Sequence, residues 1–594
     1  MVSTRQRVAV VTGGGGGIGA AIAEELGRGG WFVVTVDPLV TLDGTETLTE
    51  TRESTADRIV AAGGSARASA VSVTDSEAVR KLFRGLAAEH GGLDAVVNVA
   101  GITRQTGFAH GTEADWLAVL TVHLQGYLNI LDGALPLMAE AGHGRIVGVT
   151  SGSGWRPADA GAYSCAKRVV AALTWQLAGA TPPGVTVNAM SPIAATRMVA
   201  AAIERARDVA REAARAGGGP GGGTGSGGGL SLFSMAGPEV LGPIGAHLVG
   251  EDFGWCRGQV LFAGGSEVAV VAEPRLLEVV RSTDVHSLDR VLSTVVPRAF
   301  AGAEARQSSD GGSNPRFASI FDESAGGPGG PSAEAAASPP PGEAGPVSVG
   351  SCVIASDRPA LSTTLVAALQ ARGIDCHRAE AVRGFDEAGR ALRSVVESAG
   401  DVDALVWAPA GHPPDVDAAA ATKDAGNWQR VLAAHRGIVE DLHADAGWAR
   451  AVADHAAEAR RPMRLVTLVE AESAGGRSRA QAAIQLARAA AGATEGRVTA
   501  FAASLEASGP ANDSATAELV AHLLTNPDAT TLAGAELVVG DGWLGLRSHP
   551  RPSGSVTYGG PGVPDWLDAT LQEIVGSGVP DAGARPADQP SEVR

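Results

Sequence analysis

Short apolar runs, separated by polar or glycine-rich turns, recur through the first half of the chain. They lie at residues 8–11, 31–36, 93–97, 145–150 and 185–190, and a further strand is expected at 66–73. Continuous apolar runs of this length are typical of parallel strands buried on both faces. Helical segments, such as 76–90 and 113–131, separate the runs. The alternation predicts an α/β fold, a doubly wound parallel sheet with helices on both faces.

The first run leads into the glycine-rich stretch 12–19 (TGGGGGIG) and then into a predicted helix at 20–26. In such a turn, glycines let the backbone approach a pyrophosphate, and the helix N-terminus attracts its charge. The chain has 80 glycines, so the flanking strand and helix carry this interpretation more than the glycines do. The stretch predicts a dinucleotide site, and its candidate residues are Thr12, Gly13, Gly17, Ile18 and Gly19.

Asp37 ends the second predicted strand, about 20 residues after the glycines, where a cofactor ribose is expected. A carboxylate there accepts hydrogen bonds from both ribose hydroxyls and repels a 2′-phosphate, which favours NAD over NADP. The alternative is that Asp37 only begins an Asp-Pro turn.

The strand–helix alternation restarts near residue 347, after a stretch rich in Ser, Gly, Pro and Ala. A chain of 594 residues is too long for one core. We therefore expect two tandem domains, at 1–300 and 347–549, a disordered linker at 301–346 and a tail at 550–594. The segment 217–229 (GGGPGGGTGSGGG) is either a tolerated insertion or a mobile lid.

Composition narrows the class of protein. A net charge of −18 argues against a nucleic-acid partner. Four widely spaced cysteines form no metal or disulfide pattern, which favours a cytoplasmic location. No apolar run is long enough to cross a membrane, and the N-terminal residues MVSTRQR leave no room for a signal peptide.

Candidate catalytic residues follow the strand expected at 145–150. Tyr163 and Lys167 are four residues apart, so they share one face of a helix, and Ser151 directly follows the strand. The chain has only three tyrosines and three lysines, which makes a chance pairing here improbable. A nearby ammonium is expected to lower the pKa of the phenol, as an acid or base near neutral pH requires.

Together these motifs resemble the short-chain dehydrogenase/reductases over about residues 5–275: the glycine turn, Asn98-x-Ala100-Gly101, Ser151 and Tyr163-x3-Lys167. The resemblance implies a Rossmann-type fold, with Asn98, Ala100, Gly101, Pro192 and Thr196 joining Tyr163 and Lys167 at the cofactor. It implies that Tyr163 exchanges the proton with the alcohol or carbonyl oxygen and that Lys167 lowers its pKa and holds the nicotinamide ribose. Ser151 orients the substrate.

The chain departs from the family pattern at several positions. Val99 replaces an asparagine, Ser72 an acidic residue and Ile193 a glycine, while His123 stands where the family has the asparagine of a proton relay. In this replacement by histidine, the chain resembles the 3-hydroxyacyl-CoA dehydrogenase module of multifunctional enzymes. In that setting His123 is expected to pass a proton through water.

The second half resembles a further copy of the same unit that has lost its chemistry. Its glycine turn is replaced by 356–359 (SDRP), and a proline offers no N–H to a phosphate. No tyrosine lies between Tyr163 and Tyr558, and residues 480–486 occupy the corresponding helix. Family subunits pair through the helix that carries the catalytic residues, so we expect an intrachain pseudo-dimer, with further homo-oligomerisation left open.

The expected function is NAD-dependent hydride transfer between a secondary alcohol and a ketone, with a 3-hydroxyacyl-CoA or a hydroxysteroid as substrate. Two alternatives remain at this point. One is an NADPH-dependent 3-oxoacyl reductase, against which Asp37 argues. The other is a non-catalytic cofactor-binding scaffold or sensor, which the replaced residues favour and the intact Ser151, Tyr163 and Lys167 oppose.

Overall fold

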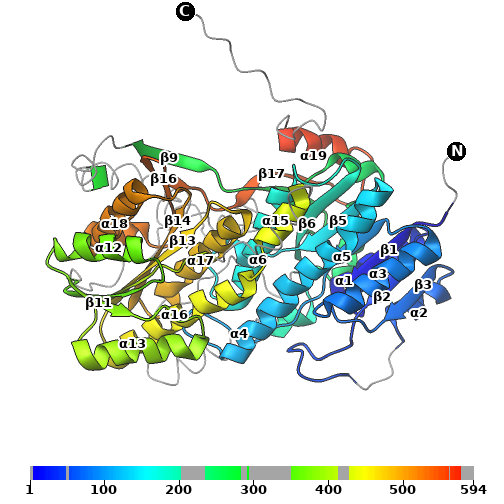
Figure 1. Ribbon diagram of the computed structural model, residues 1–594. Helices are drawn as coiled ribbons and strands as arrows, with labels where there is room; N and C mark the ends of the chain where they lie inside the picture. Colours follow the sequence, from blue (N-terminus) through cyan, green and yellow to red (C-terminus); the bar gives the residue numbers. More distant parts are fainter. Residues whose placement is uncertain are drawn as a thin grey trace, which may run out of the picture.

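The computed structural model describes residues 5–48, 53–201, 235–281, 291–292, 349–411, 427–560 and 562–576. These residues form two α/β halves that lie side by side (Figure 1). The expected glycine-rich segment 217–229 and linker 301–346 lie outside the described residues.

The first half is built on a sheet of nine described strands in the order β17-β8-β7-β6-β5-β4-β1-β2-β3. Pairing is parallel from β3 to β7 and antiparallel at β8 and β17. Its strands are β1 Val8–Thr12, β2 Phe32–Val36, β3 Ser65–Ser69, β4 Ala95–Asn98, β5 Gly144–Val149, β6 Val185–Ile193, β7 Val260–Gly264, β8 Glu267–Ala272 and β17 Arg551–Thr557. Its helices are α1 Gly17–Arg28, α2 Thr55–Ala61, α3 Ser76–His90, α4 Glu113–Leu120, α5 Gly126–Ala141, α6 Gly161–Leu177, α8 Gly242–His247 and α19 Leu567–Val575.

Burial along the strands follows their place in the sheet. All five residues of the central β1 are buried, as expected for an apolar strand covered on both faces, whereas β3 at the edge is polar and half exposed. The helix expected at 113–131 is divided, because a π-helical turn at Thr121–Gln125 separates α4 from α5. Such turns frequently occur at functional sites.

The second half repeats this strand order without a counterpart of β3. Its sheet runs β11-β10-β12-β13-β14-β15-β16-β9 within the described residues. The strands are β10 Ser351–Ala355, β11 Asp375–Ala379, β12 Ala404–Trp407, β13 Met463–Glu470, β14 Val498–Leu505, β15 Glu536–Gly540, β16 Trp543–Arg547 and β9 Leu276–Arg281. The helices are α12 Pro359–Gln370, α13 Phe385–Ala399, α15 Asn427–Ala434, α16 Ile438–Ala459, α17 Ala474–Ala493 and α18 Pro510–Thr525.

The two halves exchange their last strands, which the sequence did not lead us to expect. After β8, the chain crosses over and β9 pairs antiparallel with β16 of the second sheet. After β16, it crosses back and β17 pairs antiparallel with β8 of the first sheet. In Figure 1 the green β9 therefore lies among the orange strands, and β17 and α19 lie on the first half.

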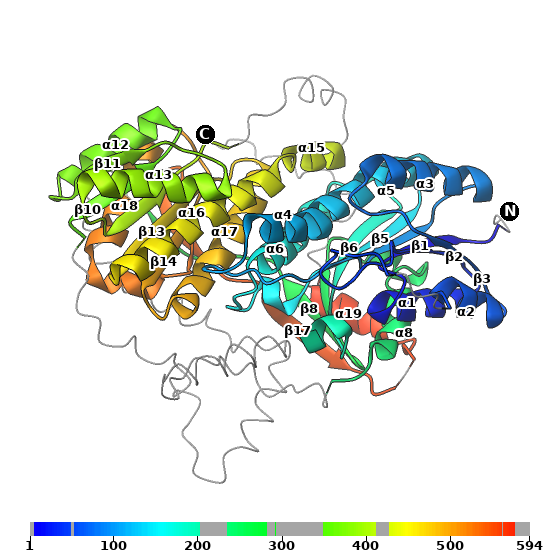
Figure 2. The same ribbon diagram turned by 90° about the horizontal axis from the view of Figure 1, so that it is seen from below.

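The helices between the two sheets join the halves into one core. Figure 2 shows α4 and α6 of the first half facing α16 and α17 of the second, and α6 packs along α17. One cluster of buried apolar side chains contains residues of both halves, including Val169 and Leu173 of α6 and Ala483 and Ala490 of α17. The catalytic helix expected from the sequence is thus also the main contact with the second half.

The exchange makes a prediction about stability. Leu571 of α19 is fully buried against the outer face of the first sheet, within the same cluster as Val268 and Val270 of β8. Leu571→Ala should lower the free energy of unfolding by about 2–5 kcal/mol, because it leaves a cavity in that face. Urea denaturation measures the change, with the exposed Glu573→Ala in the same helix as the control. Equal stability of the two variants would contradict the docking of α19.

Candidate active site

The candidate residues collect at the carboxyl edge of the first sheet, where ligands bind in open parallel sheets. Thr12 ends β1, Asn98 ends β4, Ser151 follows β5, and Pro192 lies in the last part of β6. Strand order β6-β5-β4-β1 brings these four ends together.

The glycine turn between β1 and α1 has the shape that a dinucleotide phosphate requires. Gly13 adopts a φ of +66°, and a Cβ there would lie 2.9 Å from the backbone nitrogen of Ala100. A Cβ on Gly17, by contrast, would meet open space. Gly16 precedes α1 without a side-chain cap, and the first turn of α1 carries no acidic residue. The first-turn N–H groups therefore fit an anion at the positive end of the helix.

Asp37 is fixed against this turn. Its carboxylate accepts hydrogen bonds from the N–H groups of Gly15, at 3.0 Å, and Leu39, at 2.8 Å. A Cβ on Gly15 would lie 2.7 Å from the Asp37 carboxylate, so only glycine allows this approach. A negative charge is thus held beside the glycine turn.

Buried polar contacts tie β1 to β4 behind the turn. The Thr12 hydroxyl donates to Asn98 Oδ1 at 2.7 Å and accepts from the N–H of Ala100 at 3.2 Å. Gly101 makes room for the next candidate, since a Cβ there would lie 2.4 Å from the His123 ring.

Tyr163, Lys167 and Ser151 come together as the spacing predicted. Tyr163 and Lys167 lie on α6, with Lys167 Nζ 5.5 Å from the centre of the Tyr163 ring. Lys167 Nζ donates to the backbone carbonyl of Val149 at 2.7 Å, and the Ser151 side chain lies near enough to the Tyr163 hydroxyl to favour the phenolate. The three residues lie at the carboxyl end of β5. The strand β4 separates β5 from β1, which leads into the glycine turn.

The pKa of Tyr163 is raised, whereas we expected the Lys167 ammonium to lower it. Burial raises the pKa of Tyr163, and the Ser151 side chain acts in the opposite direction. Burial also lowers the pKa of Lys167 to about 7, because the ammonium is removed from water. The same burial that brings the lysine close to the phenol therefore weakens its charge, and Ser151 is the group that favours the phenolate.

His123 lies in the π-helical turn and meets Tyr163 edge to face, with ring centres 5.1 Å apart. Its Nε2 lies 2.7 Å from the carbonyl oxygen of Ile102, and its buried Nδ1 has no partner among the described residues. Burial and the charge of Lys167 lower the pKa of His123 to about 3, so the ring is neutral at neutral pH. The same Nε2 also lies 3.2 Å from the backbone N–H of Ile102, and a proton relay through His123 would use the neutral form of the ring.

The segment after β6 contributes one expected and one unexpected residue. The Thr196 hydroxyl accepts from the N–H of Val199 at 3.2 Å, which caps the helical turn at 197–201. Arg197 reaches the glycine turn, with Nη2 3.6 Å from the position of a Cβ on Gly16. Our sequence reasoning missed Arg197, although its place directly after Thr196 was a usable signal.

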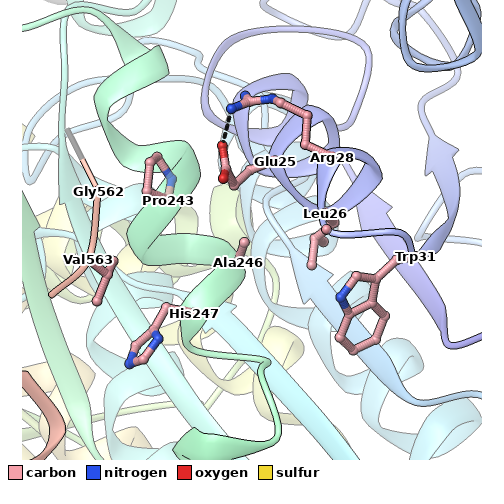
Figure 3. Close-up of a pocket in the computed structure, with 10 residues that line it drawn as sticks. Glu25, Leu26, Arg28, Trp31, Pro243, Ala246, His247, Gly562 and Val563 are labelled. Atoms are coloured by element: carbon pink, nitrogen blue, oxygen red, sulfur yellow. Dashed lines mark ion pairs between the residues drawn. The ribbon is translucent and has the colours of Figure 1, made fainter. Parts of the chain in front are cut away.

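A pocket of about 460 Å³ lies elsewhere, at the C-terminal end of α1 (Figure 3). It is lined by residues that include Trp31, His247 and Val563, and by the Glu25–Arg28 ion pair. It contains none of the candidate residues, and we assign it no role in the chemistry. Within the described ranges no group of side chains is suited to hold a metal ion, and no helix is long and apolar enough to cross a membrane.

A glycine turn, an adjacent acid and a Ser–Tyr–Lys triad at the edge of a parallel sheet define a dinucleotide-dependent oxidoreductase. Residues 7–207 match the short chain dehydrogenase family. The chain is 37% identical over 199 residues to an acetoacetyl-CoA reductase of Cupriavidus necator, covering 33% of this chain and 78% of the relative. The chain therefore belongs to the short-chain dehydrogenase family.

Two further similarities were found. Hydroxyacyl-CoA dehydrogenase ChsB1 of Mycobacterium tuberculosis is 36% identical over 216 residues, covering 34% of this chain and 66% of that protein. A solved short chain dehydrogenase from Mycobacterium avium shares 29% identity with a TM-score of 0.38, covering 49% of this chain and 95% of that one. The protein is an NAD(P)-dependent enzyme that interconverts a secondary alcohol and a ketone.

The buried state of His123 predicts a pH dependence of stability. An unfolded histidine takes up a proton near its ordinary pKa of 6.5, whereas the folded one does so only near 3. His123 therefore contributes stability above pH 6.5 that is lost as the pH falls toward 3. His123→Asn should remove up to about 1.4 kcal/mol per pH unit from that dependence. Urea denaturation at a series of pH values between 3 and 6.5 measures the free energy of unfolding of both proteins. The same pH dependence in the two proteins would contradict a buried neutral His123.

Proposed function

We propose that the first half is an NAD-preferring oxidoreductase of 3-hydroxyacyl-CoA and 3-oxoacyl-CoA thioesters. The observation that carries the reaction is the grouping of Tyr163 and Ser151 beside the buried Lys167, whose Nζ lies 5.5 Å from the centre of the Tyr163 ring. The names of the relatives, acetoacetyl-CoA reductase and hydroxyacyl-CoA dehydrogenase, support a thioester substrate over a hydroxysteroid.

The residues present fit a nicotinamide dinucleotide, which when bound donates or accepts the hydride. Gly13, Gly17 and the first turn of α1 would hold its phosphates, and Asn98, Ala100, Gly101, Pro192 and Thr196 would line the rest of its site. Tyr163 would give its proton to the ketone oxygen in reduction and take it back in oxidation. Ser151 would orient that oxygen and stabilise the charge on Tyr163, and Lys167 would contribute its charge when protonated.

Asp37 supports NAD as the preferred cofactor. Its carboxylate is held at the glycine turn by two backbone N–H groups, so it cannot easily move away from a ribose 2′-phosphate. A fixed negative charge at that place repels the extra phosphate of NADP. Arg197 is a positive charge that acts against this preference. Its exposed guanidinium approaches Gly16, on the side of the glycine turn where the phosphates are expected.

We further propose that residues 347–549 are a degenerate copy of the first unit, joined to it as an intrachain pseudo-dimer. The shared strand order and the packing of α6 along α17 support this. Tyr163 and Lys167 are the third and seventh residues of α6, and the third and seventh residues of α17 are Gly476 and Ala480. The copy therefore lacks both catalytic side chains.

The place of a cofactor in the second half is filled by the chain's own charges. Arg358, just before α12, pairs with Glu470 at 3.0 Å and with Asp513 at 3.7 Å. Glu470 also accepts from the N–H of Gly411 at 2.7 Å. The two carboxylates beside this helix start would repel a phosphate, which supports a single cofactor site in the chain. The cytoplasmic location stays a prediction.

The proposed role of Tyr163 predicts a loss of turnover without a loss of binding. Tyr163→Phe should lower kcat for the reduction of acetoacetyl-CoA with NADH by about 10²–10⁴-fold, because it removes the proton donor. NADH titration by fluorescence should give an unchanged Kd. Tyr127→Phe is the control, since it removes the same hydroxyl group from a buried tyrosine of α5 outside the triad. An active Tyr163→Phe enzyme would rule out the proposed chemistry.

The proposed role of Asp37 predicts a change in cofactor preference. The wild-type protein should bind NADH at least about tenfold more tightly than NADPH, and Asp37→Ala should reduce or reverse that ratio. Asp132→Ala is the control, because Asp132 pairs with Arg80 on the outer surface. Equal binding of both cofactors by the wild-type protein would refute the NAD assignment, and tighter binding of NADPH would favour the 3-oxoacyl reductase alternative.

A further inference from the structure

The second half binds the backbone that directly follows the catalytic serine. The carbonyl groups of four consecutive residues, 153–156, each accept a hydrogen bond from a side chain. Gln485 Nε2 donates to the carbonyl oxygens of Ser153, at 3.0 Å, and Arg156, at 2.6 Å. Arg488 Nη1 donates to the carbonyl oxygen of Trp155. Gln485 and Arg488 both belong to α17.

The remaining carbonyl group is bound indirectly by the same half. Arg168 of α6 donates to the carbonyl oxygen of Gly154 at 3.3 Å. Its guanidinium is fixed by donation to Gln481 Oε1 at 2.7 Å and to Glu536 Oε2 at 3.1 Å. Arg168 and Glu536 are both fully buried. Every side-chain hydrogen bond to these four carbonyl groups therefore comes from the second half or is anchored there.

The geometry points to Gln485 and Arg488 as positioning residues for Ser151. The second half thereby supports the reaction of the first half, although it carries no catalytic side chain. This inference rests on the proposed function of the first half. It assigns to α17 the task of holding the turn at 152–156, which connects Ser151 to the loop that leads to Tyr163.

The local structure explains why this turn needs external support. It is a single 3₁₀ turn, Gly152–Gly154, whose two glycines have more conformational freedom than other residues. The Ser151 hydroxyl accepts from the N–H of Ser153 at 3.3 Å, so a shift of Ser153 moves the Ser151 side chain. Gln485 binds the carbonyl of that same residue, and the Ser151 side chain is the group that lowers the pKa of Tyr163 against the effect of burial.

The orientation of the Gln485 amide follows from its partners. Both acceptors are carbonyl oxygens, so the NH₂ group must face them. Methionine has nearly the same shape as glutamine and lacks the donor, which makes Gln485→Met the sharpest test. Gln176→Met is the matched control, because Gln176 also crosses the α6–α17 contact, donating to Ser478 at 3.1 Å, but does not touch the turn.

Kinetics of the full-length chain with acetoacetyl-CoA and NADH tests the positioning role. Gln485→Met should lower kcat about tenfold to a hundredfold through a displaced Ser151, with the Kd for NADH changed less than about twofold. The apparent pKa of Tyr163 in the kcat profile should rise, because Ser151, which lowers it, is displaced. The groups that face Tyr163 are otherwise unchanged, namely Lys167 of its own helix and His123. Gln176→Met should show neither effect.

Hydrogen exchange gives a readout that does not depend on the substrate. Amides of residues 152–160 should exchange faster in Gln485→Met than in Gln176→Met or the wild-type protein. Arg488→Met, which loses the bond to Trp155, should act in the same direction if Gln485→Met does not fold. Equal exchange in this turn, or an equal loss of kcat in both glutamine variants, would overturn the inference. Faster exchange in a protein that does not reduce acetoacetyl-CoA would retain the positioning role and refute the proposed substrate.

Discussion

The packing of α6 along α17 is the contact on which the rest of the structure depends. Beside it lies the buried ion pair of Arg168, on α6, and Glu536, the first residue of β15, and Gln481 of α17 is hydrogen bonded to both. Burial lowers the pKa of Arg168 to about 10 and raises that of Glu536, so for each group the loss of water outweighs the partner's charge. Such a pair adds little net stability, but losing one partner would leave the other buried and unpaired. The pair therefore restricts the position of α6 relative to β15 and, through Gln481, relative to α17.

The exchanged strands make this contact permanent. Because β9 belongs to the second sheet and β17 to the first, neither half can leave the other without breaking a strand pairing in each sheet. A contact between separate subunits would depend on protein concentration, whereas this one is part of folding. The buried apolar cluster that runs through α6 and α17 is consistent with a single cooperative unit.

The sequence was most informative where chemistry requires few residue types. The spacing of Tyr163 and Lys167 on one helix, and the strand–glycine–helix order at 8–26, led to the observed arrangement because each depends on local geometry. The pKa of Tyr163 could not be predicted in this way, since it depends on burial by parts of the chain distant in sequence. The strand exchange could not be predicted from the sequence either. The strands β9 and β17 have the pattern of ordinary edge strands, and tertiary contacts decide which sheet each one joins.

Gln485 and Arg488 carried a signal that the sequence analysis did not use. Gln481, Gln485 and Arg488 are spaced to lie on one face of an alanine-rich helix, and three large polar residues on a helix expected at an interface require buried partners. Those partners are the turn carbonyls and Arg168.

Under the proposed relation between the two halves, this arrangement also explains what a copy gains by losing its chemistry. In a pair of identical subunits, each helix at the contact must both carry Tyr and Lys and support its neighbour. Here Gly476 and Ala480 stand at the catalytic positions of α17, so that helix is free of catalytic constraints. Its remaining polar side chains can be devoted to the partner's turn, in an asymmetric pair in which one unit would react and the other would hold it in place.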